Sequence, residues 1–280
     1  MRSAGGIGVG AREPGAADQH RREQIVILQA TDVGSGPAAI ILHGLFGTAS
    51  NFATIQRRLA VGRRVVTMDL RNHGRSSHDP VMDYPSMAAD VVETMASLGL
   101  ERAALVGHSM GGKVVMQAAL RMPDRVVRLL IADIAPVDYP PRYRTIADAM
   151  LALPLAPGLT RATADAALAD AVPDTAMRQF LLSNLRFGET PSWRIGLRAI
   201  AEALPAIEGW EWSGEGVYAG PTLVLRGERS DYIKPGDRAL FRRLFPAARF
   251  AALRDAGHWL HADAPDAFVA TVDAFLPRIE

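Results

Sequence analysis

Apolar residues along the chain follow two alternating patterns. Short runs rich in Val, Ile and Leu are separated by stretches with apolar residues at helical spacing, and these runs occupy residues 38–42, 64–70, 103–107, 126–134, 221–225 and 249–253. Continuous apolar runs are typical of strands buried on both faces of a parallel sheet, and helical spacing is typical of the helices that cover it. The order predicts an α/β fold with a doubly wound, mostly parallel sheet. Residues 24–31 predict an edge strand.

The strand pattern is interrupted between residues 136 and 216. Prolines divide this segment into several predicted helices. We therefore expect a helical cap at residues 136–216, inserted into an α/β core made of residues 23–135 and 217–280. Residues 1–22 lack the continuous apolar run of a signal peptide, so we expect a flexible tail and a cytoplasmic protein.

Charge and composition narrow the classes of partner. The 280-residue chain has 31 Lys and Arg against 30 Asp and Glu, so no net field attracts nucleic acid or an anionic membrane. It has no Cys, which excludes disulfides, thiolate metal sites and a cysteine nucleophile. No His, Asp and Glu cluster has the spacing of metal ligands, so no metal or organic cofactor is expected. We expect a small-molecule substrate.

The segment at residues 103–116 carries the clearest chemical signal. An apolar run leads into Gly-His-Ser-Met-Gly at residues 107–111, and a helical pattern follows. A strand, a sharp turn and a helix hold the central serine in a strained conformation at the end of the strand. The helix N-terminus offers unpaired N–H groups and a positive dipole end to a developing oxyanion. Ser109 is therefore the candidate nucleophile.

Several further motifs make the chain similar to a known family. They are His-Gly-Leu-Phe-Gly at 43–47, Arg-Asn-His-Gly at 71–74, Gly-His-Ser-Met-Gly-Gly-Lys at 107–113, Asp-Ile-Ala-Pro-Val-Asp-Tyr at 133–139 and Gly-His-Trp at 257–259. From about residue 24 the chain resembles the α/β-hydrolases, and more narrowly the bacterial short-chain esterase and thioesterase group. The resemblance implies a serine hydrolase that cleaves carboxylic esters or acyl thioesters through an acyl-serine intermediate.

The resemblance also implies roles for particular residues. In α/β-hydrolases the serine, the acid and the histidine follow in that chain order, which makes His258 the base. Asp133 and Asp231 both follow predicted strands, and both are candidates for the acid. We favour Asp133 because it stands in the motif shared with the narrower group. The oxyanion hole is expected to consist of the backbone N–H groups of Leu45 and Met110.

The other histidines have expected supporting roles. We expect His43 to support the oxyanion loop and His73 to fix the loop that follows Asp69. Asp69 itself is expected to cap the turn at residues 71–76. His261 is expected at the surface or at the rim of the site.

The cap is expected to supply specificity. Its many apolar side chains favour a short or medium acyl group over a sugar or a peptide. The candidate substrate-binding residues are Phe46, His108, Phe187, Trp193 and Trp259. The cap also contains Arg142, Arg144 and Arg186. These arginines are either exposed to solvent or in contact with a polar leaving group, such as the phosphates of coenzyme A.

Two other functions remain open at the level of sequence. The same serine, histidine and acid serve other α/β-hydrolase chemistry, such as cofactor-free haloperoxidase activity or hydrolysis of carbon–carbon bonds. A ligand-binding protein that keeps the fold without turnover is the alternative from a different class.

Overall fold

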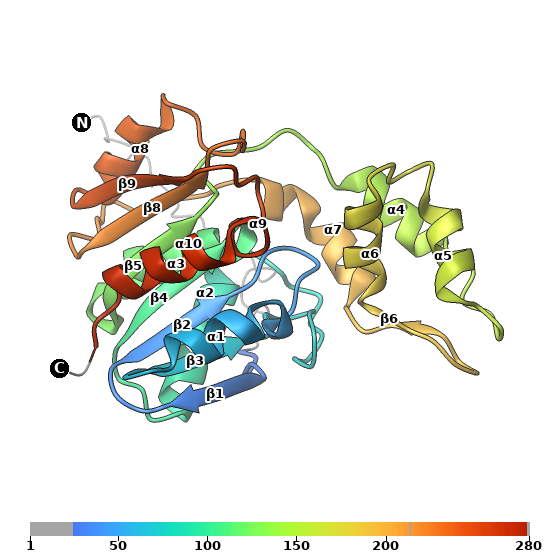
Figure 1. The fold of residues 1–280 in the computed structure, drawn as a ribbon, viewed down its shortest axis with the longest axis horizontal. Coiled ribbons are helices and arrows are strands. Elements are labelled where there is room, and N and C mark those ends of the chain that lie inside the picture. Colours follow the sequence, from blue (N-terminus) through green and yellow to red (C-terminus); the bar gives the residue numbers. More distant parts are fainter. Residues whose placement is uncertain (1–24, 213, 279–280) are drawn as a thin grey trace, which may run out of the picture.

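A seven-stranded sheet forms the core of the molecule (Figure 1). The computed structural model describes residues 25–212 and 214–278; the predicted tail at residues 1–22 lies outside them. The strands of the sheet are β1 (Ala30–Gly34), β2 (Ala38–Leu42), β3 (Arg64–Met68), β4 (Ala103–His108), β5 (Val126–Ala132), β8 (Thr222–Gly227) and β9 (Ala248–Leu253). Their spatial order is β1-β3-β2-β4-β5-β8-β9, with β1 antiparallel and the remaining pairs parallel. The predicted α/β class and mostly parallel sheet are confirmed.

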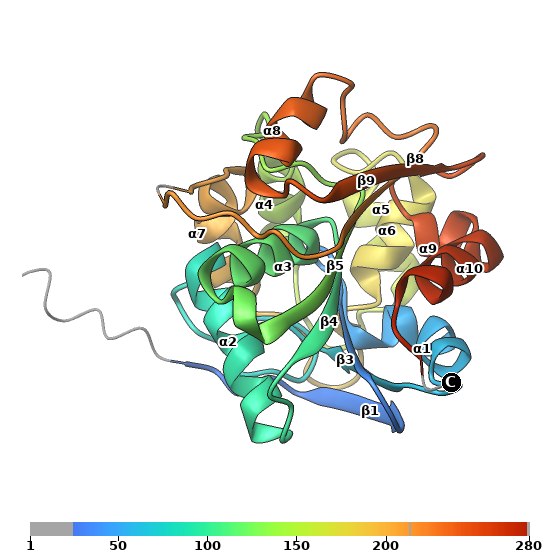
Figure 2. The same cartoon turned by 90° about the vertical axis from the view of Figure 1, so that its left-hand side faces the viewer.

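Helices cover both faces of the sheet, as Figure 2 shows. On one face lie α2 (Tyr84–Ser97), α3 (Met110–Arg121) and α8 (Asp237–Leu244), and on the other lie η1 (Ala49–Phe52), α1 (Ala53–Leu59), α9 (Leu260–Asp263) and α10 (Pro265–Phe275). The turn η2 (Pro123–Arg125) precedes β5. Ile40 and Ile41 of β2 belong to different core layers, because successive side chains of a strand point to opposite faces. Two hydrophobic layers therefore sandwich the sheet.

The segment between β5 and β8 forms a group of elements to one side of the sheet (Figure 1). It contains α4 (Arg144–Ala152), α5 (Arg161–Leu168), α6 (Thr175–Leu182), the short strands β6 (Leu185–Arg186) and β7 (Ser192–Trp193), and α7 (Leu197–Glu208). The hairpin of β6 and β7 was not predicted, because two residues are too few to show an alternating pattern. We call residues 136–216 the cap, as a proposed boundary.

The predicted edge strand at residues 24–31 was wrong in its position. Pairing with β3 begins only at Ala30. Before it, the backbone N–H groups of Val26 and Leu28 donate to side chains of α2, namely Asp90 Oδ1 at 2.7 Å and Thr94 Oγ1 at 2.9 Å. Val26 and Leu28 are thus held by a helix and not by a neighbouring strand, whereas Gln29 bonds to the segment after β3, through Asp69 and Ser76. An apolar pattern does not reveal this distinction.

Within the part of the chain that the structure describes, no helix combines the length and the apolar character that crossing a bilayer requires.

Candidate active site

Ser109 lies on a tight turn between β4 and α3. Its backbone has φ 53° and ψ −121°, a region that only a strongly constrained non-glycine residue adopts. A Cβ at Gly107 would lie 2.1 Å from the carbonyl oxygen of Gly111, and a Cβ at Gly111 would lie 2.5 Å from the carbonyl oxygen of His43. Both glycines are therefore required for the close approach of strand, turn and helix. The turn carries Ser109 to the carboxyl end of β4, in the middle of the sheet.

Three side chains from different strand ends form a hydrogen-bonded chain. His258 Nε2 lies 3.0 Å from Ser109 Oγ, and His258 Nδ1 lies 2.8 Å from Asp133 Oδ2. Asp133 is fully buried and has a φ of 54°, which ends β5 at Ala132 instead of the predicted residue 134. Its carboxylate also accepts hydrogen bonds from the Gly227 N–H at 3.0 Å and from the Ser230 hydroxyl. Because the carboxylate accepts from Nδ1, Nε2 is left free to accept from the serine hydroxyl.

The other predicted acid lies away from this chain. The side chain of Asp231 is 73% exposed and pairs with Arg142, with 3.2 Å between the carboxylate oxygen and Nη2. The Arg142 hydrogen bond lowers the pKa of Asp231 below its usual value. The structure thus brings Asp133, and not Asp231, to the ring of His258.

Two buried histidines hold the loop at residues 43–47. The Leu70 N–H donates to His43 Nε2 at 3.0 Å, while His43 Nδ1 lies 2.8 Å from the Gly44 carbonyl oxygen. The Phe46 N–H donates to His73 Nε2 at 3.1 Å. Burial lowers the pKa of His43 to about 4 and that of His73 to about 3, so both rings are neutral at pH 7 and can accept these bonds. Both link this loop to the segment after β3.

The same segment is fixed by Asp69. Its carboxylate accepts hydrogen bonds from the N–H of Ala49 at 2.7 Å and from the N–H of Arg75 at 3.0 Å. It therefore ties the predicted turn at residues 71–76 to the start of η1.

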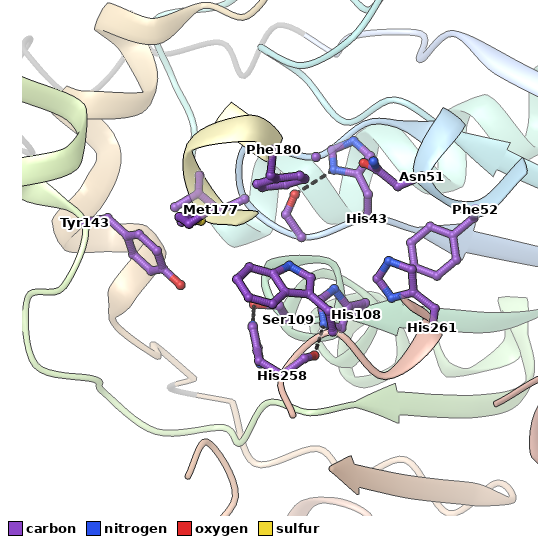
Figure 3. Close-up of a pocket in the computed structure, with 14 residues that line it drawn as sticks. His43, Asn51, Phe52, His108, Ser109, Tyr143, Met177, Phe180, His258 and His261 are labelled. Atoms are coloured by element: carbon purple, nitrogen blue, oxygen red, sulfur yellow. Dashed lines mark hydrogen bonds between the residues drawn. The ribbon is translucent and has the colours of Figure 1, made fainter. Parts of the chain in front are cut away.

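A small cavity of about 30 Å³ contains Ser109 and His258 (Figure 3). The cap contributes Tyr143, Met177 and Phe180 to its walls. The remaining lining residues come from the core: His43, Gly44, Leu45, Gly47, Asn51, Phe52, His108, Trp259 and His261. Figure 3 shows Tyr143 and Met177 on one side of Ser109, and Phe52 and His261 on the other. The nucleophile thus lies at the junction of cap and core.

A second cavity, also about 30 Å³, includes Ser109 but not His258. It shares Leu45 and Tyr143 with the first and adds Tyr84, Met110, Ile134, Tyr139, Pro140, Arg142, Ile207, Glu208 and Tyr232. Its tyrosines form a connected wall, in which Tyr139 Oη donates to the Tyr232 carbonyl at 2.6 Å and the hydroxyls of Tyr143 and Tyr232 lie 2.7 Å apart. Burial raises the pKa values of Tyr139 and Tyr143, so both remain neutral phenols.

The five predicted substrate-binding residues differ in their positions. His108 and Trp259 line the first cavity, and His108 Nε2 also donates to the His258 carbonyl at 2.7 Å. Phe46 is buried and outside both cavities, with its carbonyl accepting from Asn184 Nδ2 at 2.7 Å. The cap residues Phe187 and Trp193 also line neither cavity.

Packing within the cap explains the last two positions. Phe187 is 38% exposed on the β6–β7 loop, with the guanidinium of Arg161 over its ring at 6.0 Å. The indole N–H of Trp193 donates to the Met150 carbonyl of α4 at 3.2 Å. Both aromatic side chains thus pack inside or on the cap, away from Ser109.

Sequence reasoning assigned no role to two residues around the histidine. The ring of Tyr232 stacks on the ring of His258, with centroids 3.8 Å apart and an interplanar angle of 14°. Ser230, whose hydroxyl binds Asp133, occupies the position at which many α/β-hydrolases carry their acid, three residues after Gly227. That position was a usable signal for Ser230, whereas no local pattern marks Tyr232.

A buried lysine joins the two ends of the cap to α3. Lys113 Nζ donates to the carbonyl oxygens of Val137 at 2.9 Å, Glu208 at 3.2 Å and Gly209 at 2.5 Å. The rings of Tyr84 and Tyr139 lie 5.6 and 4.9 Å from the ammonium. Desolvation lowers the pKa of Lys113 to about 7. The helix α3, which begins directly after Ser109, therefore also holds both ends of the cap.

Comparison with known proteins identifies the family. A family model described as alpha/beta hydrolase fold matches residues 37–265. The chain belongs to this family. It is 41% identical over 249 residues to the sn-1-specific diacylglycerol lipase ABHD11 of Mus musculus. The aligned region covers 86% of this chain and 81% of that protein. It is 36% identical over 238 residues to esterase YbfF of Escherichia coli (strain K12), with 85% and 92% covered.

A solved structure agrees with this result. A marine microorganism esterase superposes with a TM-score of 0.86 at 35% sequence identity, covering 90% of this chain and 100% of that one. The predicted α/β-hydrolase resemblance is confirmed, and the similarity to esterases and lipases supports ester hydrolase activity.

Proposed function

We propose that this chain cleaves carboxylic esters through an acyl intermediate on Ser109. The observation that carries the proposal is the chain of hydrogen bonds from Ser109 through His258 to the buried Asp133, at 3.0 and 2.8 Å. A serine hydroxyl is a poor nucleophile at neutral pH unless a base lies within hydrogen-bond reach and a third group orients that base. Both conditions are met here, by side chains that follow three different strands.

In the first half of the reaction Ser109 Oγ attacks the ester carbonyl carbon, and His258 Nε2 takes the hydroxyl proton. Asp133 holds Nδ1 of His258 and stabilises the imidazolium. The imidazolium then donates its proton to the alcohol oxygen as the ester bond breaks. In the second half, water attacks the carbonyl carbon of the acyl-serine while His258 Nε2 takes its proton. The imidazolium then returns this proton to Ser109 Oγ as the bond between Oγ and the acyl carbon breaks and the acid is released.

The oxyanion hole is assigned to the backbone N–H groups of Leu45 and Met110. Within the described residues neither N–H donates a hydrogen bond. Both residues line the second cavity, which includes Ser109. Met110 is the first residue of α3, where the helix dipole also favours a negative charge. Leu45 belongs to the loop that His43 and His73 hold in place.

The second cavity is assigned to the acyl group. It includes Leu45, Ile134 and Ile207, whose apolar side chains suit a hydrocarbon chain, and its small volume favours a short one. Acyl thioesters contain the same acyl group and are the alternative substrate class. The relatives named as a diacylglycerol lipase and as an esterase support the ester.

Covalent labelling tests the mechanism directly. A fluorophosphonate should add to Ser109 of the active protein, which intact-mass and peptide analysis would detect. Ser109→Ala should lower kcat for p-nitrophenyl acetate by about 10⁴-fold or more. Circular dichroism would verify that the variant is folded. An active protein without the adduct, or a folded Ser109→Ala variant with wild-type turnover, would overturn the proposal.

A further inference from the structure

A groove of about 450 Å³ lies beside the candidate active site. Residues of η1, α1, α6, α9 and the start of α10 line it: Asn51, Thr54, Ile55, Ala176, Phe180, Trp259, His261, Ala262, Asp263 and Pro265. Asn51, Phe180, Trp259 and His261 also line the cavity that contains Ser109 and His258. The two spaces therefore adjoin. The groove is much larger than either cavity at Ser109, and its volume is typical of ligand-binding sites.

The direction of the reaction determines which half of a substrate can enter this groove. The leaving oxygen must lie within hydrogen-bond reach of His258 Nε2, because that atom supplies its proton. The cavity that adjoins the groove includes His258, whereas the second cavity does not. The alcohol half of an ester thus leaves toward the groove, and the acyl half faces the second cavity.

The chemistry of the groove walls indicates which alcohol they bind. Ile55 of α1 and Ala176 and Phe180 of α6 provide apolar surface. Burial lowers the pKa of His261 to about 4, so its ring is neutral at pH 7. Asp263, which accepts from the Gly257 N–H at 2.7 Å, is the one carboxylate among the lining residues, and none of those residues is Lys or Arg.

We propose that the groove binds the hydrocarbon chain of an uncharged alcohol leaving group. This inference rests on the proposed ester hydrolysis at Ser109. The substrate class is then an ester of a short acid with a medium-chain alcohol. A phosphate-bearing leaving group such as coenzyme A finds no cation in the groove and meets the carboxylate of Asp263. Arg142 lies instead in the second cavity, on the acyl side, and is paired with Asp231.

A series of acetate esters tests the proposal on the whole protein. Ethyl, butyl, hexyl and octyl acetate have the same acyl group and leaving oxygens of similar basicity, so differences in rate report the binding of the chain. The measurement is kcat/KM from acid release. We expect it to rise about two- to fourfold per added methylene until the groove is filled, as burial of each methylene predicts. Acetyl-coenzyme A should be a poorer substrate than octyl acetate.

Two variants locate the effect. Ala262→Trp places an indole in the groove from an exposed position of α9, and should lower the ratio of kcat/KM for octyl over ethyl acetate at least about fivefold. Ala176→Trp, on α6 at the cap side of the groove, should lower the same ratio and serves as the second variant if Ala262→Trp does not fold. Ala267→Trp on α10 is the matched control, since Ala267 is exposed and outside the groove; its ratio should equal that of the wild type.

The outcomes separate the two proposals. A wild-type protein that hydrolyses all four acetates equally well would overturn the groove assignment and leave the mechanism at Ser109 intact. Acetyl-coenzyme A turnover equal to that of octyl acetate would overturn the preference for an uncharged leaving group. Hydrolysis that persists in folded Ser109→Ala would overturn the proposed function itself.

Discussion

The Nδ1 atom of His258 lies 2.8 Å from Oδ2 of the buried Asp133. Asp133 reaches this position from the end of β5, a strand next to the one that carries Ser109. Asp231 lies in the loop after β8, where it is exposed and forms an ion pair with Arg142. The two aspartates that the sequence left as alternatives therefore have separate environments, and each environment predicts a different effect of substitution.

Asn substitution of each aspartate tests this difference. Asp133→Asn keeps the shape of the side chain but removes the charge that stabilises the imidazolium, and should lower kcat by about 10²-fold or more. Asp231→Asn removes an exposed ion pair and should cost less than about tenfold. The measurement is kcat for a short ester, with folding checked by circular dichroism. A larger loss at Asp231 than at Asp133 would contradict the assignment of the acid.

Ser230 gives a second test of the same carboxylate. Its hydroxyl donates to Asp133 Oδ2, the oxygen that also binds His258. Ser230→Ala should lower kcat by about tenfold, the effect expected from the loss of one hydrogen bond to a charged group. Ser230→Thr keeps a hydroxyl and is the matched control, which should retain more activity than the alanine variant. Equal rates for Ser230→Ala and the wild type would show that this bond does not orient the acid.

The local signals predicted the strand, the turn and the helix around Ser109, because each depends on residues close together in sequence. The parallel sheet followed from the alternation of apolar runs and helical spacing. Long-range contacts were harder to predict. Tyr232 stacks on His258 only because β8 and β9 pair side by side, and no pattern within the segment at residues 228–234 indicates that contact.

The cap shows the same limit. Apolar composition predicted that some cap side chains would reach the serine, but the orientation of each helix depends on its packing. Phe180 therefore reaches the cavity, whereas Phe187 and Trp193 do not. Phe46 stands in a motif, yet it is buried with a φ of 60°, and its role in the loop is visible only once its neighbours are known.

The buried Lys113 predicts a pH dependence of stability. Its pKa in the folded protein is lowered to about 7, compared with an ordinary value of 10.5. Between these values the unfolded chain binds the proton and the folded chain releases it, so the free energy of unfolding rises with pH. Lys113→Met removes this contribution. Urea unfolding at pH 7.5 and 9.5 measures the effect. The free energy of unfolding of the wild type should rise, relative to that of the variant, by up to about 1.4 kcal/mol per pH unit.

The chain provides its own control for this experiment. Lys234 is the other lysine of the sequence and is exposed. The difference in free energy of unfolding between the wild type and Lys234→Met should be the same at both pH values. A Lys113→Met variant that also differs from the wild type by a constant amount would show that the ammonium is not desolvated in the folded protein.

His261 predicts a pH dependence of the same sign at lower pH. Burial lowers its pKa to about 4, from 6.5. Between these values the unfolded chain binds a proton that the folded chain does not, so the free energy of unfolding decreases as the pH is lowered. Its Nδ1 also has no hydrogen-bond partner among the described residues. His261→Phe should lose about 1–2 kcal/mol less stability than the wild type between pH 7 and pH 5. Urea unfolding at both pH values measures this, and an unchanged loss would contradict the prediction.

Two phenylalanines of the cap test how it selects substrates. Phe180 on α6 lines both the cavity at Ser109 and the adjoining groove, whereas Phe187 on the β6–β7 loop lines neither and stacks with Arg161. Phe180→Ala removes apolar contact area and should lower kcat/KM for octyl acetate at least about tenfold more than for ethyl acetate. Phe187→Ala should leave that ratio unchanged. Equal effects of the two variants on the ratio would mean that the cap selects substrates through its general stability and not through the side chains that reach the serine.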